Sequence, residues 1–325
     1  MNSLSYDVLD LRILHALHLD ARAPFARIAA VLGVSDQTVA RRCARLRAEG
    51  SLRVRGLADP ARLGHVEWVV RIRCAPDSAA GVASALARRG DTSWISRTSG
   101  GTELVCVTHS PTPAGDLLLK SLPRSARILD ITAHCLLHVF GGRAGGAVTK
   151  LDALSPEQVD LLRPPSPDLA RPVELDEVDH RLLALLRVDG RTSVSTLAAE
   201  TGMSHSAVQR RIADLRGTGV LYFDVDTDRA RLGLHVRTLL WLTVAPARVH
   251  ATGTALAAHP EVVFAAATTG AHNLYASVAT PDVAGLYAFL SGAVPALDDV
   301  RAVESSLVLH TVKGSPGVPV PEPIR

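Results

Sequence analysis

The stretch SDQTVARRCARLRAEG at residues 35–50 returns, with many of the same residues, as SHSAVQRRIADLRGTG at residues 204–219, 169 positions later. The match extends without a gap from Asp7 and Asp176 to Gly64 and Gly233. After an offset of one residue it continues more weakly, and SGGTELVCVTHSP at 99–111 corresponds to TGAHNLYASVATP at 269–281. The chain is therefore an internal duplication of a two-part unit.

The first part of each unit has the pattern of three short helices. Both copies have an acidic cap before the first helix, a glycine at the end of the second and a serine cap before the third. These residues are Asp7, Gly33 and Ser35 in the first copy, and Asp176, Gly202 and Ser204 in the second. A tight glycine turn before the last of three helices indicates a helix-turn-helix domain.

The third helix of the first copy has a polar face that suits DNA. Gln37, Arg41 and Arg45 lie opposite its apolar stripe. Arginine can pair with guanine and glutamine with adenine in the major groove, and the neighbouring Arg42 and Arg47 can neutralise phosphates. The alternative is a helix face that is merely solvated, but the surrounding three-helix pattern favours DNA.

The corresponding face of the second copy has diverged in charge. Ser206, Arg210 and Arg211 are its candidate DNA contacts, while Asp214 stands where the first copy has Arg45. Three aspartates follow, at positions 224, 226 and 228. Residues 1–64 carry 10 arginines against 6 acids, whereas residues 173–233 carry 8 against 10. Because an aspartate facing phosphate is repulsive, we expect the first copy to contribute more DNA affinity. Drift on a tolerant surface is the alternative.

The second part of each unit reads strand, helix, strand, strand, helix, strand, the ferredoxin-like βαββαβ order. The strands and helices are expected at 66–74, 79–89, 92–99, 103–108, 114–122 and 127–139, and again at 236–244, 247–258, 262–269, 273–279, 282–294 and 300–312. Between the copies, Ser155, Pro156 and Gln158 form a helix-start signature inside a glycine- and proline-rich linker.

The whole sequence thus predicts an α+β fold: two winged helix-turn-helix domains and two βαββαβ modules. We expect helix-turn-helix domains at 1–60 and 173–229, βαββαβ modules at 61–140 and 230–314, a linker with a short helix at 141–172 and a proline-rich tail at 315–325.

Composition narrows the function classes. The 325 residues are 47% hydrophobic and 21% charged, without a long apolar run or a leader-like N-terminus, so we expect a cytoplasmic protein with no membrane partner. The four cysteines are widely spaced, which predicts buried reduced thiols and no metal site. No phosphate-binding glycine loop or nucleophile elbow is present, and no cofactor is predicted.

Both helix-turn-helix segments resemble the Lrp/AsnC family of bacterial transcriptional regulators, here in a tandem, double-length form. The resemblance is carried by LDLRILHALHLDARAPFARIAAVLGVSDQTVARRCARLRAEGSLR, which starts at Leu9, and by VDHRLLALLRVDGRTSVSTLAAETGMSHSAVQRRIADLRGTGVL, which starts at Val178. It implies sequence-specific binding of double-stranded DNA. It further implies that each βαββαβ part is a ligand-responsive and oligomerising module, that one chain is a built-in pseudo-dimer, and that such chains assemble into homo-oligomers.

The resemblance also points to an effector site, often for an amino acid, at a Gly-x-x-Asp turn between the second and third strands. The matching segments are residues 100–103 and 270–273, and both lack the aspartate. The effector candidates are Ser99, Gly100 and Glu103 in the first module, and Thr269, Gly270 and Asn273 in the second. Glu103 keeps the charge, whereas Asn273 loses a partner for a ligand ammonium group. Alternatively, the two glycines only serve tight hairpin turns.

An enzyme is the competing interpretation, because siroheme decarboxylases resemble the same two-part unit and sometimes occur as fused pairs. Their third strand carries a pattern of asparagine, methionine and tryptophan. This chain matches it only in part, because Leu274 and Tyr275 follow Asn273 and no tryptophan comes after them. His138 and His310 recur in the last strands, and the favoured explanation for both is a polar residue on the solvent-exposed face of a strand. A ligand sensor that has lost DNA binding is a third interpretation. The arginine face favours the regulator, and we expect no enzymatic activity.

Overall fold

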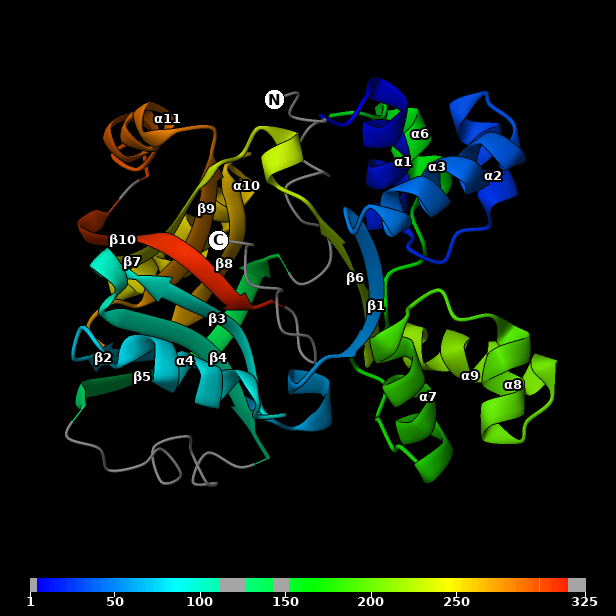
Figure 1. The fold of residues 1–325 in the computed structure, drawn as a ribbon, viewed down its shortest axis with the longest axis horizontal. Coiled ribbons are helices and arrows are strands. Elements are labelled where there is room, and N and C mark those ends of the chain that lie inside the picture. Colours follow the sequence, from blue (N-terminus) through cyan, green and yellow to red (C-terminus); the bar gives the residue numbers. More distant parts are fainter. Residues whose placement is uncertain (1–4, 112–126, 143–151, 298, 315–325) are drawn as a thin grey trace. The chain divides into compact units, whose positions relative to one another are not determined.

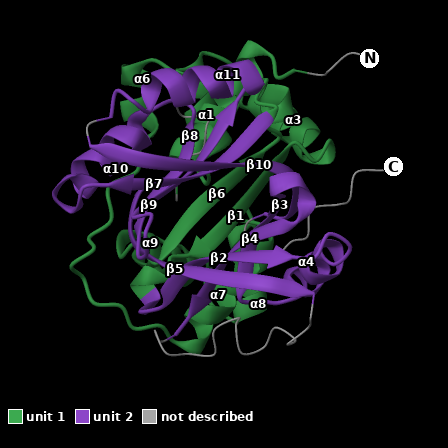
Figure 2. Cartoon of the chain, turned by 90° about the vertical axis from the view of Figure 1, so that its left-hand side faces the viewer, with its two compact units in different colours: residues 1–62, 142–235 green, residues 63–141, 236–325 purple. Residues whose placement is uncertain are grey.

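The computed structural model describes residues 5–111, 127–142, 152–297 and 299–314. The chain divides into two compact units, and each unit combines segments of both repeats (Figure 2). Unit 1 comprises residues 1–62 and 142–235, and unit 2 comprises residues 63–141 and 236–325. The expected helix at 114–122, the tail at 315–325 and part of the linker lie outside the described residues.

Unit 1 contains both helix-turn-helix domains (Figure 1). Its helices are α1 Val8–Leu19, α2 Phe25–Leu32, α3 Asp36–Ala48, α6 Pro156–Leu162, α7 Glu177–Val188, α8 Val194–Thr201 and α9 His205–Gly217. The predicted caps are confirmed: Asp7 and Asp176 form capping boxes, and Ser35 and Ser204 accept hydrogen bonds from the first turns of α3 and α9. The glycines that end α2 and α8 adopt the left-handed conformation.

The linker helix α6 begins as its sequence predicts. Ser155 and Gln158 form a reciprocal capping box, with Pro156 in the first turn. The Gln158 side chain also donates a hydrogen bond of 3.0 Å to the carbonyl of Val31 at the end of α2. Leu162 at the end of α6 is fully buried. The linker helix is therefore part of the packing of the first helix-turn-helix domain.

One strand follows the third helix of each domain, β1 (Leu52–Ala58) and β6 (Leu221–Thr227). These strands do not form a separate wing in each domain. They pair with each other in an antiparallel ladder whose middle rung joins Arg55 and Asp224, which occupy equivalent positions of the two repeats. The first helices are exchanged as well, because α7 packs on β1 and α1 packs on β6. Unit 1 thus has the pairing of a two-fold dimer inside one chain.

Unit 2 is an eight-stranded closed barrel built from the strands of both modules. The strands are β2 Val66–Cys74, β3 Thr92–Thr98, β4 Glu103–Ser110, β5 Ile128–Gly141, β7 Val236–Val244, β8 Val262–Thr268, β9 Leu274–Thr280 and β10 Val300–Lys313. Their order around the barrel is β10-β3-β4-β2-β5-β8-β9-β7. The two long last strands close it, because β5 pairs with both β2 and β8, and β10 pairs with both β7 and β3.

Helices pack on the barrel, and its buried side chains form three hydrophobic clusters. The helices are α4 Ala79–Ala87, α10 Val249–Ala258 and α11 Val283–Ala288, the last continuing as a π-helical turn at Phe289–Ala293. One cluster lies in each module, and a third joins residues of both, including Val69, Leu239, Trp241 and Tyr275. The described elements of the second module follow the predicted βαββαβ order, but the segment expected to be one continuous helix at 282–294 is α11 followed by the π-helical turn. In the first module the described elements follow the same order, and the helix predicted at 114–122 lies outside the described residues.

No helix in the described part of the chain has both the length and the apolar character that a membrane span requires.

Candidate nucleic-acid interface and effector loops

The third helices α3 and α9 each present two of the predicted DNA contacts to solvent. Gln37 and Arg41 are exposed on α3, and Ser206 and Arg210 are exposed at the equivalent positions of α9. Among the described residues, the guanidinium groups of Arg41 and Arg210 have no hydrogen-bond or ion-pair partner. Two free guanidinium groups on equivalent helices are available to bases or phosphates.

Arg42 and Arg211 have partners within their own domains. Arg42 pairs with Asp7 and with Asp10, and Arg211 pairs with Asp176 at 2.5 Å and with Asp179 at 2.8 Å. Burial opposes the ionisation of Asp7, but the hydrogen bonds from Arg42 and from backbone amides outweigh it and lower the pKa of this carboxyl. Both arginines therefore fasten the third helix to the cap of the first, a structural role that is not evident from the sequence.

Arg45 and Arg47 are also engaged within unit 1. Arg45 donates to both carboxylate oxygens of Asp10, at 2.9 and 2.7 Å, and reaches Glu49 at 3.1 Å. Arg47 donates to Asp189 of the second domain at 2.6 Å. Its equivalent Arg216 pairs reciprocally with Asp20 of the first domain at 3.0 Å. Arg47 thus contributes to the joining of the two domains.

A second reciprocal contact was missed from sequence. Arg22 donates to the carbonyls of Gly190 and Thr192, and Arg191 donates to those of Ala21 and Ala23. Burial lowers the pKa of both guanidinium groups. The signal that could have revealed them is their identity at equivalent positions of the repeats, outside any DNA-facing helix.

Two of the three aspartates after α9 have a different environment from the one predicted. They were expected to face phosphate, but Asp224 and Asp226 lie on β6 opposite Arg55 and Arg53 of β1. Arg55 is 4% exposed. Opposite charges in register stabilise a strand pair, whereas like charges destabilise it. The charge divergence of the two repeats therefore matches β1 to β6, which explains part of the asymmetry without DNA.

The effector candidates of the first module form a charged cluster in unit 2. Glu103 is 4% exposed and accepts hydrogen bonds from Arg71 at 2.8 Å, Thr98 at 2.9 Å and Ser99 at 3.1 Å. Arg71 also pairs with Glu304 of β10 and stacks 4.0 Å above the ring of Trp241. Burial favours the neutral form of Arg71, but the carboxylates of Glu103 and Glu304 have the larger effect and raise the pKa of Arg71. Glu103 thus already has a cationic partner inside the protein.

Gly100 lies in a short 3₁₀ turn between β3 and β4, with a φ of +69°. This backbone conformation favours glycine. The turn is exposed to solvent.

The equivalent loop of the second module is closed by protein atoms. The Nδ1 atom of His134 lies 2.8 Å from the carbonyl oxygen of Thr269, and a Cβ at Gly270 would come within 2.4 Å of the same ring atom. Asn273 exchanges two hydrogen bonds with the backbone of Val244, at 2.8 and 2.9 Å. Its amide therefore fixes the end of β7.

Comparison with known proteins adds to this geometry. The chain matches the AsnC-type helix-turn-helix domain over residues 7–47 and again over 175–216, and the Lrp/AsnC ligand binding domain over residues 238–318. It is 30% identical over 142 residues to an HTH-type transcriptional regulator of Pyrococcus horikoshii, covering 43% of this chain and 90% of the relative. The chain belongs to the Lrp/AsnC family.

Two further comparisons differ in how much of this Lrp/AsnC chain they cover. Transcriptional regulator AzlB of Bacillus subtilis is 25% identical over 154 residues, which is 46% of this chain and 98% of AzlB. The crystal structure of the siroheme decarboxylase NirDL instead covers 95% of this chain and 93% of its own, with a TM-score of 0.65 and 14% identity. This chain and NirDL therefore share the same duplicated fold.

The histidines considered for tetrapyrrole chemistry have separate neighbours. His138 is exposed on β5, with its ring against Phe140 and His250, and His310 pairs in register with Arg97 on β3. In the described ranges, no three His, Cys, Asp or Glu side chains are grouped as metal ligands would be. Of the four cysteines expected to be buried, Cys43, Cys74 and Cys106 are buried and Cys135 is half-buried. Burial raises the pKa of Cys106 to about 12.

Proposed function

We propose that this Lrp/AsnC protein is a cytoplasmic, sequence-specific DNA-binding transcriptional regulator without enzymatic activity. The observation that carries the proposal is the pair Arg41 and Arg210, which are exposed at equivalent positions of two helix-turn-helix domains and have no ion-pair or hydrogen-bond partner among the residues that the structure describes. The β1–β6 ladder joins these domains with two-fold symmetry. Dimeric helix-turn-helix proteins read two half-sites with such a symmetric pair of helices.

We place the response to a small effector, such as an amino acid, at the first βαββαβ module. Its loop retains a charged cluster that reaches solvent through Glu304, whose side chain is 42% exposed. The second loop is filled by His134 and held by Asn273. An effector at the first loop would have to exchange with the Arg71 contacts of Glu103 and Glu304, and such an exchange could transmit binding to β10.

A tetrapyrrole enzyme is the second candidate, and one observation favours it. The fold of NirDL is matched along nearly the whole chain, whereas the regulators are matched along about half of it. However, Asn273 is bound to the backbone of β7 and no tryptophan follows it on β9.

Two measurements on one preparation separate these candidates. A gel-shift titration with DNA from upstream of the gene is expected to show a discrete complex, because two basic helices are available to two half-sites. Addition of an iron porphyrin is expected to leave the Soret band of the free porphyrin unchanged. A shifted Soret band together with no DNA complex would favour the enzyme.

A further inference from the structure

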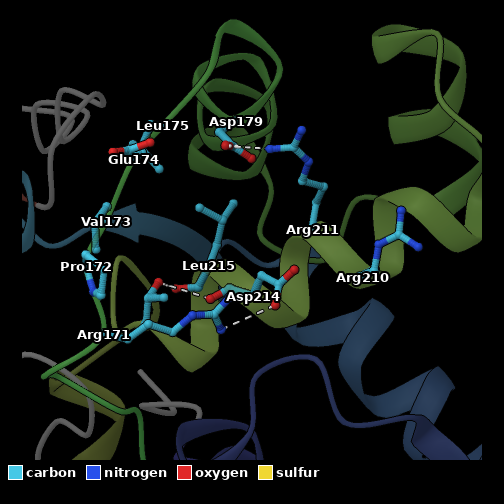
Figure 3. Close-up of a pocket in the computed structure, with 11 residues that line it drawn as sticks. Arg171, Pro172, Val173, Glu174, Leu175, Asp179, Arg210, Arg211, Asp214 and Leu215 are labelled. Carbon is cyan, nitrogen blue, oxygen red and sulfur yellow. Dashed lines mark hydrogen bonds and ion pairs between the residues drawn. The ribbon is translucent and has the colours of Figure 1, made fainter.

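A cavity of about 220 Å³ lies beside the third helix of the second domain, within unit 1 (Figure 3). It is bordered by α9, by Asp179 of α7 and by the chain segment 171–175 that precedes α7. Three acids and three arginines line it: Glu174, Asp179, Asp214, Arg171, Arg210 and Arg211. It is smaller than the ~300–1,000 Å³ typical of drug-sized pockets, so a ligand must be small.

In the first domain, an arginine side chain occupies the position that corresponds to this cavity. Asp10 corresponds to Asp179, and its carboxylate is 4% exposed. The guanidinium of Arg45 covers it and donates to both oxygens, at 2.9 and 2.7 Å. Arg42 supplies a third hydrogen bond at 3.1 Å. The buried carboxylate of the first domain is thus paired with two guanidinium groups.

The second domain has lost one of these groups. Arg211 replaces Arg42 and binds Oδ2 of Asp179 at 2.8 Å, but Asp214 stands where Arg45 would be. Oδ1 of Asp179 has no hydrogen-bond partner among the described residues, although the residue is only 3% exposed. A buried carboxylate oxygen without a donor is unfavourable. Asp214 instead contacts Arg171 at 3.5 Å, and both side chains are 52% exposed.

We propose that this cavity binds a small guanidino acid, whose guanidinium takes the position that Arg45 holds in the first domain. The planar guanidinium can donate to Oδ1 of Asp179 and to Asp214 at once, as it does in charge-assisted carboxylate pairs. Arg210, which has no ion-pair partner in the described part of the chain, borders the same cavity and can receive the ligand carboxylate. Asp214 exchanges its long, solvated contact with Arg171 for the ligand.

Calorimetry with the full-length chain tests this site in the absence of DNA, and therefore independently of the proposed regulator function. The probe is L-arginine, and the matched control is L-citrulline, which has nearly the same shape without the charge. We expect one L-arginine per chain and at least tenfold weaker binding of L-citrulline, since each lost charge-assisted hydrogen bond is worth about one factor of ten or more.

Two variants locate the ligand. Asp214→Arg restores the residue type of the first domain, so its own side chain should fill the cavity and reduce L-arginine binding at least tenfold. Asp160→Asn, at an exposed acid of α6 in the same unit, should bind as the unmodified chain does. The proposal is overturned if L-arginine gives no binding heat up to about 10 mM, where a millimolar site would be largely occupied. Equal binding of L-citrulline, or undiminished binding by the Asp214→Arg variant, would overturn it as well.

Discussion

Arg41 and Arg210 occupy equivalent places on α3 and α9 but have neighbours of different charge. One turn further along the helix, the first domain carries Arg45 and the second carries Asp214. An acid on the same face weakens attraction to phosphate. The difference persists although Asp224 and Asp226 are matched to arginines of β1.

Removal of each arginine separately should show this difference. We expect Arg41→Ala to weaken DNA binding by about tenfold, within the ~1–3 kcal/mol of a base contact, and Arg210→Ala to weaken it less. Fluorescence anisotropy at fixed salt measures both variants. Arg12→Ala, at a residue of α1 outside the third helices, is the control variant. A larger loss from Arg210→Ala would contradict the asymmetry.

His18 at the end of α1 makes the stability of unit 1 depend on pH. Its Nδ1 atom lies 2.8 Å from the carbonyl oxygen of Leu14, and burial lowers the pKa of the ring to about 4 from 6.5. The folded state therefore holds the neutral ring, while the unfolded state takes up a proton below pH 6.5. Stability from this group is fully present above pH 6.5 and is lost as the pH falls toward about 4.

Urea unfolding at about pH 7.5 and about pH 4.5 measures this loss. The His18 contribution should be roughly 2–3 kcal/mol, from ~1.36 kcal/mol for each unit of pKa difference. His18→Gln should reduce the change with pH by that amount, and His180→Gln, at an exposed residue of α7, should not. An unchanged pH dependence in His18→Gln would show that His18 is not the responsible group.

The β1–β6 ladder connects the two repeats through complementary charges. Its middle rung places Arg55 opposite Asp224, the residue at the equivalent position of the other repeat. Two residues along on the same face, Arg53 lies opposite Asp226, so this pair is also of opposite charge. If two copies of one strand paired in this register, the middle residue would face its own copy, Arg55 opposite Arg55 or Asp224 opposite Asp224. The sequence divergence at these positions therefore favours pairing within the duplicated chain.

A double-mutant cycle measures the coupling between these strands. Arg55→Asp should destabilise unit 1 by about 1–2 kcal/mol, because it places two acids in register and removes a buried arginine. Adding Asp224→Arg should recover part of that loss, with a coupling of roughly 0.5–1 kcal/mol. Denaturant unfolding of the four proteins gives the value. Strictly additive effects would show that the two charges do not interact.

The helices and strands were predictable because their signals are local. Aspartate and serine caps, the glycines after α2 and α8, and the periodic apolar residues depend on neighbours within one element. The partners of Arg42, Arg45, Arg47 and Asn273 depend on tertiary contacts. Sequence spacing therefore identified a polar face on α3 correctly. It could not separate Arg41, whose guanidinium has no partner within the described part of the chain, from the arginines that bind aspartates.

The whole molecule distributes each repeat over both compact units. Unit 1 joins the two helix-turn-helix domains, and unit 2 joins the two βαββαβ modules into one barrel. The pairing that separate chains provide in a dimer is thus supplied within one polypeptide. The barrel order could not be predicted from the βαββαβ pattern alone, because β5 and β10 each pair with strands of both modules.

Division of the chain should preserve this pairing. We expect a fragment of residues 1–150, co-expressed with residues 151–325, to co-purify as a one-to-one heterodimer in preference to either homodimer. The reason is that homodimers would place Arg55 opposite Arg55 or Asp224 opposite Asp224. Differential tagging followed by native mass spectrometry measures the three species. A statistical mixture of homodimers and heterodimers would contradict charge-selected pairing.

The regulator proposal is tested most directly by fluorescence anisotropy of the full-length protein with DNA from upstream of its own gene and with a scrambled duplex, at low and near-physiological salt. We predict tight binding that prefers the upstream duplex at the higher salt and weakens in Arg41→Ala. Weak binding that disappears with salt, ignores sequence and is unchanged in Arg41→Ala would contradict a sequence-specific regulator.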